Sequence, residues 1–367
     1  MKFTVSQSSL LEALNVVMKG IASASTLPIL SGVLVKAQDG ALEFQTANYN
    51  ISIRHRIAAR VDEEGQTVIP CKMLANITKT LPDAAVSFEQ IERQVSISCE
   101  KSSFRLNTLS VNDFPEFPTF ALERSVELPV NVLSEMVGRV WRTASTDNNR
   151  PVLKGVYMTV ENNTIRLVST DSYRLAMCDT QSETSSLEGS FQLNVPSDAF
   201  NDALSIMSGQ DSVLVGATDT QVVFTGGNTT YVARRVEGNY PDYSMLLPKS
   251  CATTVKISVD ELSASLKRVA AVAQTNSAVK FEVSCEAGTL SLSAISSDQD
   301  VANEVLDVEA EGASGVIAFN YHYIQDCLNA LSKEKEITLE LQSYQQAGVF
   351  KSYDTINYLY LVMPVRI

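Results

Sequence analysis

The chain repeats itself three times, and this repeat constrains the fold more than any other feature of the sequence. Three similar segments each begin with a short alternating strand and continue as a helix: FTVSQSSLLEALNVVM (3–18), VELPVNVLSEMVGRVW (126–141) and VKISVDELSASLKRVA (255–270). In each helix apolar residues recur at +4 and +7, which predicts one buried face. They are Leu10, Leu14 and Val17; Leu133, Val137 and Val140; and Leu262, Leu266 and Val269. The first two copies start 123 residues apart.

Each copy continues with the same two further elements. A predicted hairpin follows the first helix, and its tight turn falls at Asp39-Gly40, Asn162-Asn163 and Ala287-Gly288. A second strand and helix then occupy 68–82, 194–207 and 318–331. The pattern predicts an α+β fold of three tandem domains, each with two helices packed on antiparallel sheets. We expect these domains at 1–121, 126–248 and 253–367.

The composition is that of well-packed globular domains, with 45% hydrophobic and 19% charged residues. Six cysteines without a Cys-x-x-Cys pair argue against a zinc site and against a secreted disulfide framework. We expect buried thiols in a reducing cytoplasm. No uninterrupted apolar run approaches the roughly 20 residues that cross a bilayer. We therefore expect a soluble, cytoplasmic protein with no membrane partner.

The strong enzymatic signatures are missing from the sequence. The two histidines, His55 and His322, lie far apart, and neither is near a nucleophile motif. The sequence has no phosphate-binding loop, no dinucleotide fingerprint and no zinc-protease or hydrolase motif. We expect a protein that is not an enzyme and that binds no metal or cofactor.

The charge distribution limits which partners a chain of repeated domains could bind or enclose. The formal net charge of −13 means that the chain as a whole repels nucleic acid. The six predicted helices hold eight basic and seven acidic residues, so they are close to neutral. Repeated domains either present an extended scaffold or join head to tail into a ring. A ring with a nearly neutral lining would let DNA pass without the tight binding that counterion release gives.

Six short motifs, in order along the chain, resemble one family: the bacterial DNA polymerase III β subunits, or sliding clamps. The motifs are MKFTV (1–5), TLPILSGVL (26–34), STDSYRLA (169–176), NYPDY (239–243), FNYHYIQDCLNAL (319–331) and VMPVRI (362–367). The resemblance implies a head-to-tail homodimer that closes six domains into a ring around double-stranded DNA, without sequence specificity. It also implies a non-catalytic processivity factor, associated with the nucleoid during replication.

The same resemblance implies a hydrophobic peptide-binding pocket between the second and third domains. Short linear peptides of the replicative polymerase catalytic subunit, the clamp loader, and repair and translesion polymerases would bind there. The residues that match its lining are Leu153, Thr170, Ser172, Tyr173, Arg174, Leu175, Pro241, Met245, Leu246, Asn320, Tyr323, Leu361, Met363, Pro364, Val365 and Arg366.

The same resemblance implies which residues face DNA and which lie at the dimer interface. In the family the first domain of one chain pairs with the third domain of the other. This would bring SSFRLN (102–107) near AAVAQ (270–274), with Phe104, Leu106 and Val272 at the interface. The residues that we expect to face DNA are Lys19, Lys72, Lys79, Arg139, Arg142, Asn149, Arg150 and Lys267.

The chain departs from the family pattern at three places. Ser172-Tyr173 stands where Gly-His is common, Met245 where Arg is common, and Ala24 where some clamps have a DNA-contacting Arg. We expect the pocket to keep its apolar character with an altered side-chain preference.

Two other functions are compatible with parts of the sequence. A repeat scaffold could bind proteins only, with no DNA in its hole. A hydrolase or phosphotransferase could use Asp171, Ser172 and Arg174, although the sequence supplies no base or metal set for it. Without the repeat and the ordered motifs, Thr170 to Arg174 would be typical of a turn at a strand end.

Overall fold

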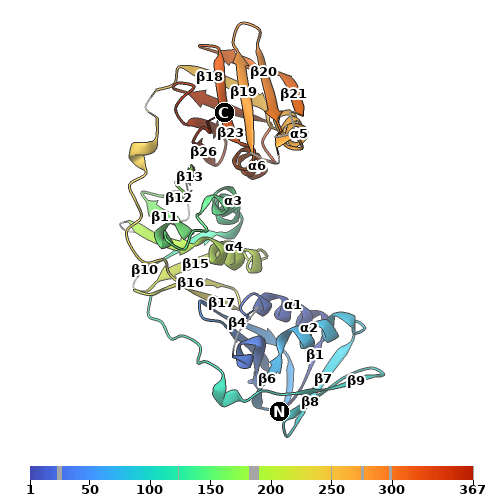
Figure 1. Cartoon of the computed structure of the whole chain (residues 1–367). Helices are drawn as coiled ribbons and strands as arrows, with labels where there is room; N and C mark the ends of the chain where they lie inside the picture. Colours follow the sequence, from blue (N-terminus) through green and yellow to red (C-terminus); the bar gives the residue numbers. More distant parts are fainter. Residues whose placement is uncertain are drawn as a thin grey trace. The chain divides into compact units, whose positions relative to one another are not determined.

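A computed structural model describes residues 1–22, 27–122, 124–181, 190–248, 250–273, 277–296 and 300–366. The chain forms two compact units (Figure 1). Unit 1 contains 1–131 and 202–235, and unit 2 contains 132–201 and 236–367. The second copy of the repeat therefore contributes to both units. Ala24, one of the three departures from the family pattern, lies outside the described residues.

Unit 1 is built on two antiparallel sheets. The eight-stranded sheet has the order β10-β15-β16-β17-β4-β3-β2-β6, and the five-stranded sheet has the order β5-β1-β7-β8-β9. The strands are β1 (Lys2–Ser6), β2 (Gly32–Gln38), β3 (Ala41–Ala47), β4 (Ile51–Ala58), β5 (Arg60–Glu63), β6 (Gly65–Pro70), β7 (Ala85–Ile91), β8 (Gln94–Cys99), β9 (Ser102–Asn107), β10 (Arg124–Pro129), β15 (Ser212–Ala217), β16 (Gln221–Gly226) and β17 (Thr229–Arg234). Short 3-10 turns occupy η1 (Pro28–Ser31) and η2 (Val111–Asp113).

Two helices of unit 1, α1 (Gln7–Met18) and α2 (Cys71–Thr80), contact each other and strands of the eight-stranded sheet (Figure 1). Helix α1 begins after Ser6, whose hydroxyl accepts a hydrogen bond of 3.2 Å from the Ser9 amide and so caps the helix. Leu10, Leu14 and Val17 are fully buried, which confirms the face that the repeat predicts.

Unit 2 repeats this architecture. Its nine-stranded sheet has the order β14-β11-β12-β13-β26-β25-β24-β18-β22, and its four-stranded sheet has the order β21-β20-β19-β23. The strands are β11 (Gly155–Glu161), β12 (Thr164–Thr170), β13 (Arg174–Gln181), β14 (Phe191–Pro196), β18 (Thr253–Ser258), β19 (Ala278–Ser284), β20 (Thr289–Ile295), β21 (Val301–Asp307), β22 (Glu309–Glu311), β23 (Gly315–Asn320), β24 (Glu336–Leu341), β25 (Gly348–Ser352) and β26 (Asn357–Val362).

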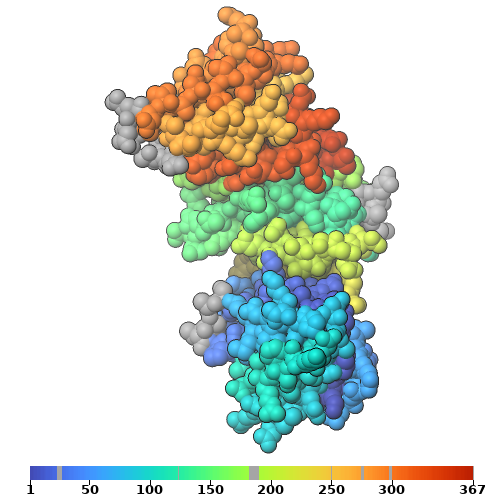
Figure 2. Space-filling view, turned by 90° about the vertical axis from the view of Figure 1, so that its right-hand side faces the viewer, coloured from blue at the N-terminus to red at the C-terminus, as the bar shows by residue number. Residues whose placement is uncertain are grey.

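Helices α5 (Val259–Ala270) and α6 (Tyr321–Ala330) contact each other and both sheets of unit 2. The side that carries them faces the viewer in Figure 2. The remaining elements are α3 (Val130–Val140), α4 (Ser197–Ile206), η3 (Trp141–Thr143), η4 (Pro151–Lys154) and η5 (Ser244–Leu246). The predicted apolar positions of α3 and α5 are buried: Leu133, Val137, Val140, Leu262, Leu266 and Val269.

The three predicted hairpins are confirmed as β2–β3, β11–β12 and β19–β20. Both residues of the first two turns have positive φ: 52° and 70° at Asp39 and Gly40, and 49° and 63° at Asn162 and Asn163. Such turns match the twist of the strands that they join, and Gly, Asn and Asp tolerate them best. The residue types at these two turns therefore made their hairpins predictable from the sequence.

The helices are close to neutral, as predicted, but they carry fewer basic residues than expected. As the structure bounds them, the six α-helices within the described ranges carry five basic and seven acidic residues. Three basic residues that the sequence pattern predicts on helices fall outside them: Lys19 caps the end of α1, Arg142 lies in η3, and Lys333 follows α6.

All six cysteines are free thiols. Cys71, Cys99, Cys178 and Cys327 are buried, as expected, and burial raises the pKa of Cys71 to about 12. The expectation is wrong for Cys251, which is exposed, and Cys285 is half-buried.

Replacing Leu14 with Ala tests the predicted helix face. Leu14 is fully buried in unit 1, so we expect Leu14→Ala to lower the free energy of unfolding by about 2–5 kcal/mol. Asn15→Ala on the exposed side of α1 is the matched control and should change it by less than about 0.5 kcal/mol. Urea unfolding followed by circular dichroism measures both. Equal effects would show that this face of α1 does not pack as described.

Candidate functional site

A tight turn joins β12 to β13 at the motif STDSYRLA. Asp171 Oδ1 accepts hydrogen bonds from the amides of Tyr173 (2.9 Å) and Arg174 (3.0 Å). Thr170 Oγ1 accepts from the Ser172 amide at 3.1 Å and donates to the Arg174 carbonyl at 2.7 Å. Ser172 has a φ of +79°, a conformation that favours glycine and costs energy for a serine. Side chains of the turn therefore hold its backbone in shape.

The guanidinium of Arg174 joins this turn to several other elements of unit 2. Its Nε donates to Asp171 Oδ2 at 3.0 Å, and its Nη1 donates to Asp326 Oδ2 on α6 at 2.6 Å and to the Tyr360 hydroxyl on β26 at 3.1 Å. Its Nη2 donates to the Arg142 carbonyl at 3.0 Å. The Tyr323 ring lies 4.4 Å from the guanidinium carbon. Arg174 is only 8% exposed, so its contacts are largely shielded from water.

Arg174 stays cationic in this setting. Burial by itself lowers its pKa, but the interaction with Tyr360 and the hydrogen bonds to Asp326 and Tyr360 outweigh burial, and Asp171 adds to them. The net shift of the Arg174 pKa is upward. A permanent buried charge with carboxylate partners on two elements fixes β13, α6 and β26 with respect to one another.

An apolar cluster lies next to this network. Val168, Leu175, Val349 and Leu361 form its buried part, and the partly buried side chains Tyr240, Tyr243, Leu247, Met177, Ala347 and Leu359 pack against it. Leu175 and Leu361 are direct partners across the β13–β26 pair. The cluster therefore spans the strand junction between the second and third copies of the repeat.

Four large apolar side chains are exposed around this junction: Tyr173, Met245, Leu246 and Met363. Met245 is 84% exposed. It lies in η5, where Asp242 Oδ1 accepts from the amide and the hydroxyl of Ser244, which lowers the pKa of Asp242. Exposed apolar side chains next to an apolar cluster are typical of an interaction surface.

The segment after β26 is held in place by main-chain hydrogen bonds. The Met363 amide donates to the Tyr173 carbonyl at 2.9 Å, and the Val365 amide donates to the Ala318 carbonyl at 2.8 Å. The segment 363–365 thus passes from the turn at Tyr173 to β23. Two stretches that lie far apart in the sequence, STDSYRLA and VMPVRI, are side by side in the structure.

The other residues expected in the pocket differ in exposure. Leu153 is buried in η4, and Ser172 accepts a hydrogen bond of 2.6 Å from Arg150 Nη1. Asn320 caps α6 by accepting from the His322 amide at 3.0 Å. Asn320, Tyr323, Pro364 and Val365 are half-buried, whereas Pro241 and Arg366 are exposed.

The comparisons with known proteins match all three copies of the repeat to one family. Residues 1–118 match the N-terminal domain, 127–242 the central domain and 244–366 the C-terminal domain of the DNA polymerase III beta subunit. The chain belongs to this family. It therefore consists of three tandem clamp domains.

The chain is similar over its whole length to members of this family. It is 29% identical to the beta sliding clamp of Synechocystis, and both chains are covered completely. It is 31% identical to the beta sliding clamp homolog GriR of Streptomyces muensis, covering 100% of this chain and 99% of that protein. A DnaN sliding clamp from Pseudomonas aeruginosa bound to griselimycin superposes with a TM-score of 0.93 at 26% identity, with both chains fully covered.

Several side chains of the junction were missed by sequence reasoning. Tyr240, Tyr243 and Leu247 pack on the apolar cluster, although only their neighbours Pro241, Met245 and Leu246 were expected there. The signal was available, because both tyrosines lie in the NYPDY motif. Asp326 lies in the motif FNYHYIQDCLNAL, but neither it nor Tyr360 was expected at the site, because their hydrogen bonds to Arg174 depend on where α6 and β26 lie in the fold.

The residues expected to face DNA are exposed with one exception. Lys19, Lys72, Lys79, Arg142, Asn149, Arg150 and Lys267 are exposed, and Lys19 pairs with Asp202 at 2.8 Å. Arg139 is only 6% exposed, so its expected DNA-facing position is wrong. Its Nη2 donates to Glu135 and Glu334, each at 2.8 Å, and its Nη1 donates to the Ile356 carbonyl at 3.2 Å. These partners hold the guanidinium inside unit 2.

Two of the three residues expected at the dimer interface lie on an outer strand. Phe104 and Leu106 are on β9, the outer strand of the five-stranded sheet, and Val272 follows α5. Phe104 and Val272 are half-buried. Leu106 is already buried within unit 1 and has little surface left for another chain.

No helix within the described ranges is long and apolar enough to span a bilayer.

Removing the Arg174 guanidinium tests its positioning role. We expect Arg174→Ala to lower the free energy of unfolding by about 2–3 kcal/mol, because hydrogen bonds to charged groups are lost and shielded partners are left unpaired. Arg166→Ala is the control, since Arg166 makes one partly exposed ion pair with Asp179 on the neighbouring strand; its effect should stay below about 1 kcal/mol. Urea unfolding measures the difference, and equal losses would contradict the role of Arg174.

Proposed function

We propose that the chain is a DNA sliding clamp: two copies join head to tail and close six domains into a ring around double-stranded DNA. The clamp holds DNA by topology, without sequence specificity, and tethers the replicative polymerase during synthesis. The observation that carries the proposal is the succession of three matches to the DNA polymerase III beta subunit along the whole chain. We propose the domain boundaries 1–121, 126–248 and 253–367.

The proposed dimer interface uses the outer strands of two sheets. Phe104 on β9 of one copy would meet Val272 and β21 of the other, with Leu106 beneath them. Strand β21 is an outer strand of the four-stranded sheet, and its Val301 and Val305 are exposed. An outer strand with exposed valines is prone to pairing, and a partner strand would cover it.

The charges are consistent with DNA held by threading. A chain of net charge −13 gains little from a general attraction to DNA. The exposed basic residues Lys72, Lys79, Arg142, Arg150 and Lys267, with Lys19 and Asn149, would touch the phosphates lightly. Few such contacts allow sliding, since each one adds to the salt-dependent binding that resists movement.

The apolar surface at the β13–β26 junction is the proposed site for partner peptides. Leu175 and Leu361 form its buried floor, and Tyr173, Met245 and Met363 are exposed around it. Apolar anchors of a short linear peptide would pack here, and the polar groups of the turn would orient its backbone. The polymerase catalytic subunit, the clamp loader, and repair and translesion polymerases are the proposed partners, in the cytoplasm at the nucleoid.

A catalytic function for the STDSYRLA motif gains no support from its geometry. Asp171 already accepts two main-chain amides and the Arg174 Nε, so it is occupied as a structural acceptor. The Arg174 guanidinium donates four hydrogen bonds and contacts the Tyr323 ring, all within unit 2. We therefore propose a non-catalytic subunit.

A DNA-topology experiment tests the ring. The protein is loaded onto nicked circular plasmid with a clamp loader, purified by gel filtration and then treated with a restriction enzyme that linearises the DNA. We expect it to elute with the circles and to be lost after linearisation, because a ring slides off a free end. Retention on linear DNA, or no association with circles, would contradict threading.

The dimer interface supplies the control for that experiment. Val305→Glu places a carboxylate on the exposed face of β21, where we expect it to block pairing with a second copy. Sedimentation should then show a monomer, and the variant should not stay on circular DNA. A dimeric Val305→Glu protein would argue against β21 as part of the interface.

Deleting residues 363–367 tests the peptide site. The deletion removes Met363 and the hydrogen bonds that its segment makes with Tyr173 and Ala318. We expect a labelled clamp-binding peptide from the replicative polymerase to lose binding in fluorescence anisotropy, while sedimentation still shows a dimer. Val305→Glu should have the opposite phenotype, with peptide binding kept and the dimer lost. Unchanged peptide affinity after the deletion would show that the peptide binds elsewhere.

A further inference from the structure

The turn at Asp171 has a close counterpart in unit 1. Where β3 passes into β4, Asn48 Oδ1 accepts hydrogen bonds from the amides of Asn50 (2.8 Å) and Ile51 (2.9 Å). The same two amides, two and three residues on, bind the carboxylate of Asp171 in unit 2. Each turn leads directly into the strand that pairs with the next copy of the repeat, β4 with β17 and β13 with β26.

The segments that cross these two turns are also equivalent. At the end of β17 the Arg234 amide donates to the Asn50 carbonyl at 2.9 Å. After β26 the Met363 amide donates to the Tyr173 carbonyl, also at 2.9 Å. Arg234 therefore occupies the position of Met363, and Asn50 that of Tyr173. These hydrogen bonds are alike at the two junctions, but φ is positive at Ser172 and not at the equivalent Tyr49, and the side chains differ.

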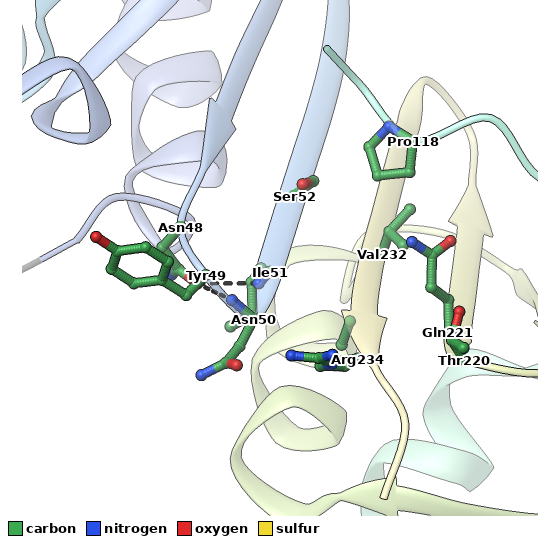
Figure 3. A pocket seen from close by; sticks show the side chains of 11 residues that line it. Asn48, Tyr49, Asn50, Ile51, Ser52, Pro118, Thr220, Gln221, Val232 and Arg234 are labelled. Atoms are coloured by element: carbon green, nitrogen blue, oxygen red, sulfur yellow. Dashed lines mark hydrogen bonds between the residues drawn. The ribbon is translucent and has the colours of Figure 1, made fainter. Parts of the chain in front are cut away.

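A pocket of about 350 Å³ lies at the junction in unit 1. Figure 3 shows its side chains, which come from the turn after β3, from β4, from the ends of β16 and β17, and from Pro118. Its lining consists of Asn48, Tyr49, Asn50, Ile51, Ser52, Pro118, Thr220, Gln221, Val232, Ala233 and Arg234. This volume accommodates a few side chains of an extended segment.

The chemistry of this pocket is polar and positive. Arg234 is the one charged side chain in the lining, is exposed, and forms no salt bridge with any residue that the structure describes. Asn50 and Gln221 add amide donors and acceptors. Tyr49, which is 65% exposed, extends at one end of the pocket in Figure 3 and offers an aromatic face. At the equivalent positions of unit 2 the chain has Met363 for Arg234 and Ser172 for Tyr49.

We propose that this pocket is a second docking site, which binds an extended peptide segment with an acidic side chain. The carboxylate pairs with the Arg234 guanidinium, whose planar donors bind carboxylates in a two-point geometry. The amides of Asn50 and Gln221 bind the peptide backbone, and a neighbouring apolar side chain packs on Tyr49. The inference rests on the proposed function in one respect: it treats the equivalent junction of unit 2 as a peptide site.

A lone guanidinium among neutral polar groups selects for acidic peptides over neutral ones. The chain as a whole is acidic, with a net charge of −13, so an acidic segment meets repulsion over most of the surface and attraction here. The two junctions therefore differ in what they select. Apolar anchors suit Met363 and Met245 in unit 2, and a carboxylate suits Arg234 in unit 1.

The test uses the full-length protein with ¹³C-labelled isoleucine and methionine methyl groups. The probe is the peptide acetyl-Gly-Asp-Leu-Asp-Gly-amide, and the matched neutral probe has Asn in place of both Asp residues. We expect the acidic peptide to shift the Ile51 methyl resonance and the neutral peptide to bind at least about tenfold more weakly. An unmoved Ile51 methyl with the acidic peptide overturns the proposal.

Two arginine variants separate a specific contact from general electrostatics. Arg234→Gln should weaken the effect of the acidic peptide on Ile51 by about tenfold. Arg56→Gln is the matched control, since Arg56 is an exposed arginine on β4 outside the pocket lining, and it should leave the affinity unchanged. Equal losses in the two variants would overturn the assignment to Arg234.

The proposed site can fail independently of the proposed function. In the protein lacking residues 363–367 the shift of Ile51 should persist, because the two junctions use different residues. Loss of that shift in the deletion would overturn the second site, whereas the deletion's effect on the polymerase peptide tests the first site alone. A single-stranded oligothymidylate that shifts Ile51 more strongly than the acidic peptide would also overturn the assignment to a peptide.

Discussion

The structure depends on hydrogen bonding between strands of successive repeats. Strand β4 of the first copy pairs with β17 of the second, and β13 of the second pairs with β26 of the third. These pairs extend the sheets to eight and nine strands and cover edges that each copy alone would expose. The outer strands β9 and β21 remain at the ends of their sheets. The proposed dimer would pair them in the same way, so one type of contact accounts for both the chain and the ring.

The same pairing creates the sites. At each junction an Asx turn precedes the pairing strand, and the partner segment crosses it through one main-chain hydrogen bond of 2.9 Å. The side chains around each junction then determine whether its surface is apolar or polar. In unit 2, Arg174 is buried and donates hydrogen bonds to Asp171, Asp326 and Tyr360. Exposed apolar side chains surround the apolar cluster there. In unit 1 the position of Arg174 is taken by Ile51, and the exposed guanidinium is that of Arg234, which forms no salt bridge with any residue that the structure describes.

Local patterns predicted local structure well. The helix faces of Leu14 and Leu266 are buried as their spacing indicates, and the turns at Asp39 and Asn162 have the positive φ values that their residues favour. Apart from the exposed thiol of Cys251, the errors concern charged side chains. Arg139 is buried, because Glu135, one helical turn away, and Glu334, distant in the sequence, meet its guanidinium. Spacing along the chain indicates which face a side chain occupies, but it does not show what partner lies opposite.

The sequence by itself determined the threefold repeat, the secondary structure of each copy and, through its ordered motifs, the family. Periodicity and turn chemistry are properties of neighbouring residues, so they can be read without a fold. Only the tertiary structure decided that STDSYRLA and the segment after β26 meet, that Asp326 and Tyr360 hold Arg174, and that a polar pocket repeats this junction in unit 1. These features join residues that are far apart in sequence, and their positions are set by strand pairing between repeats rather than by local preference.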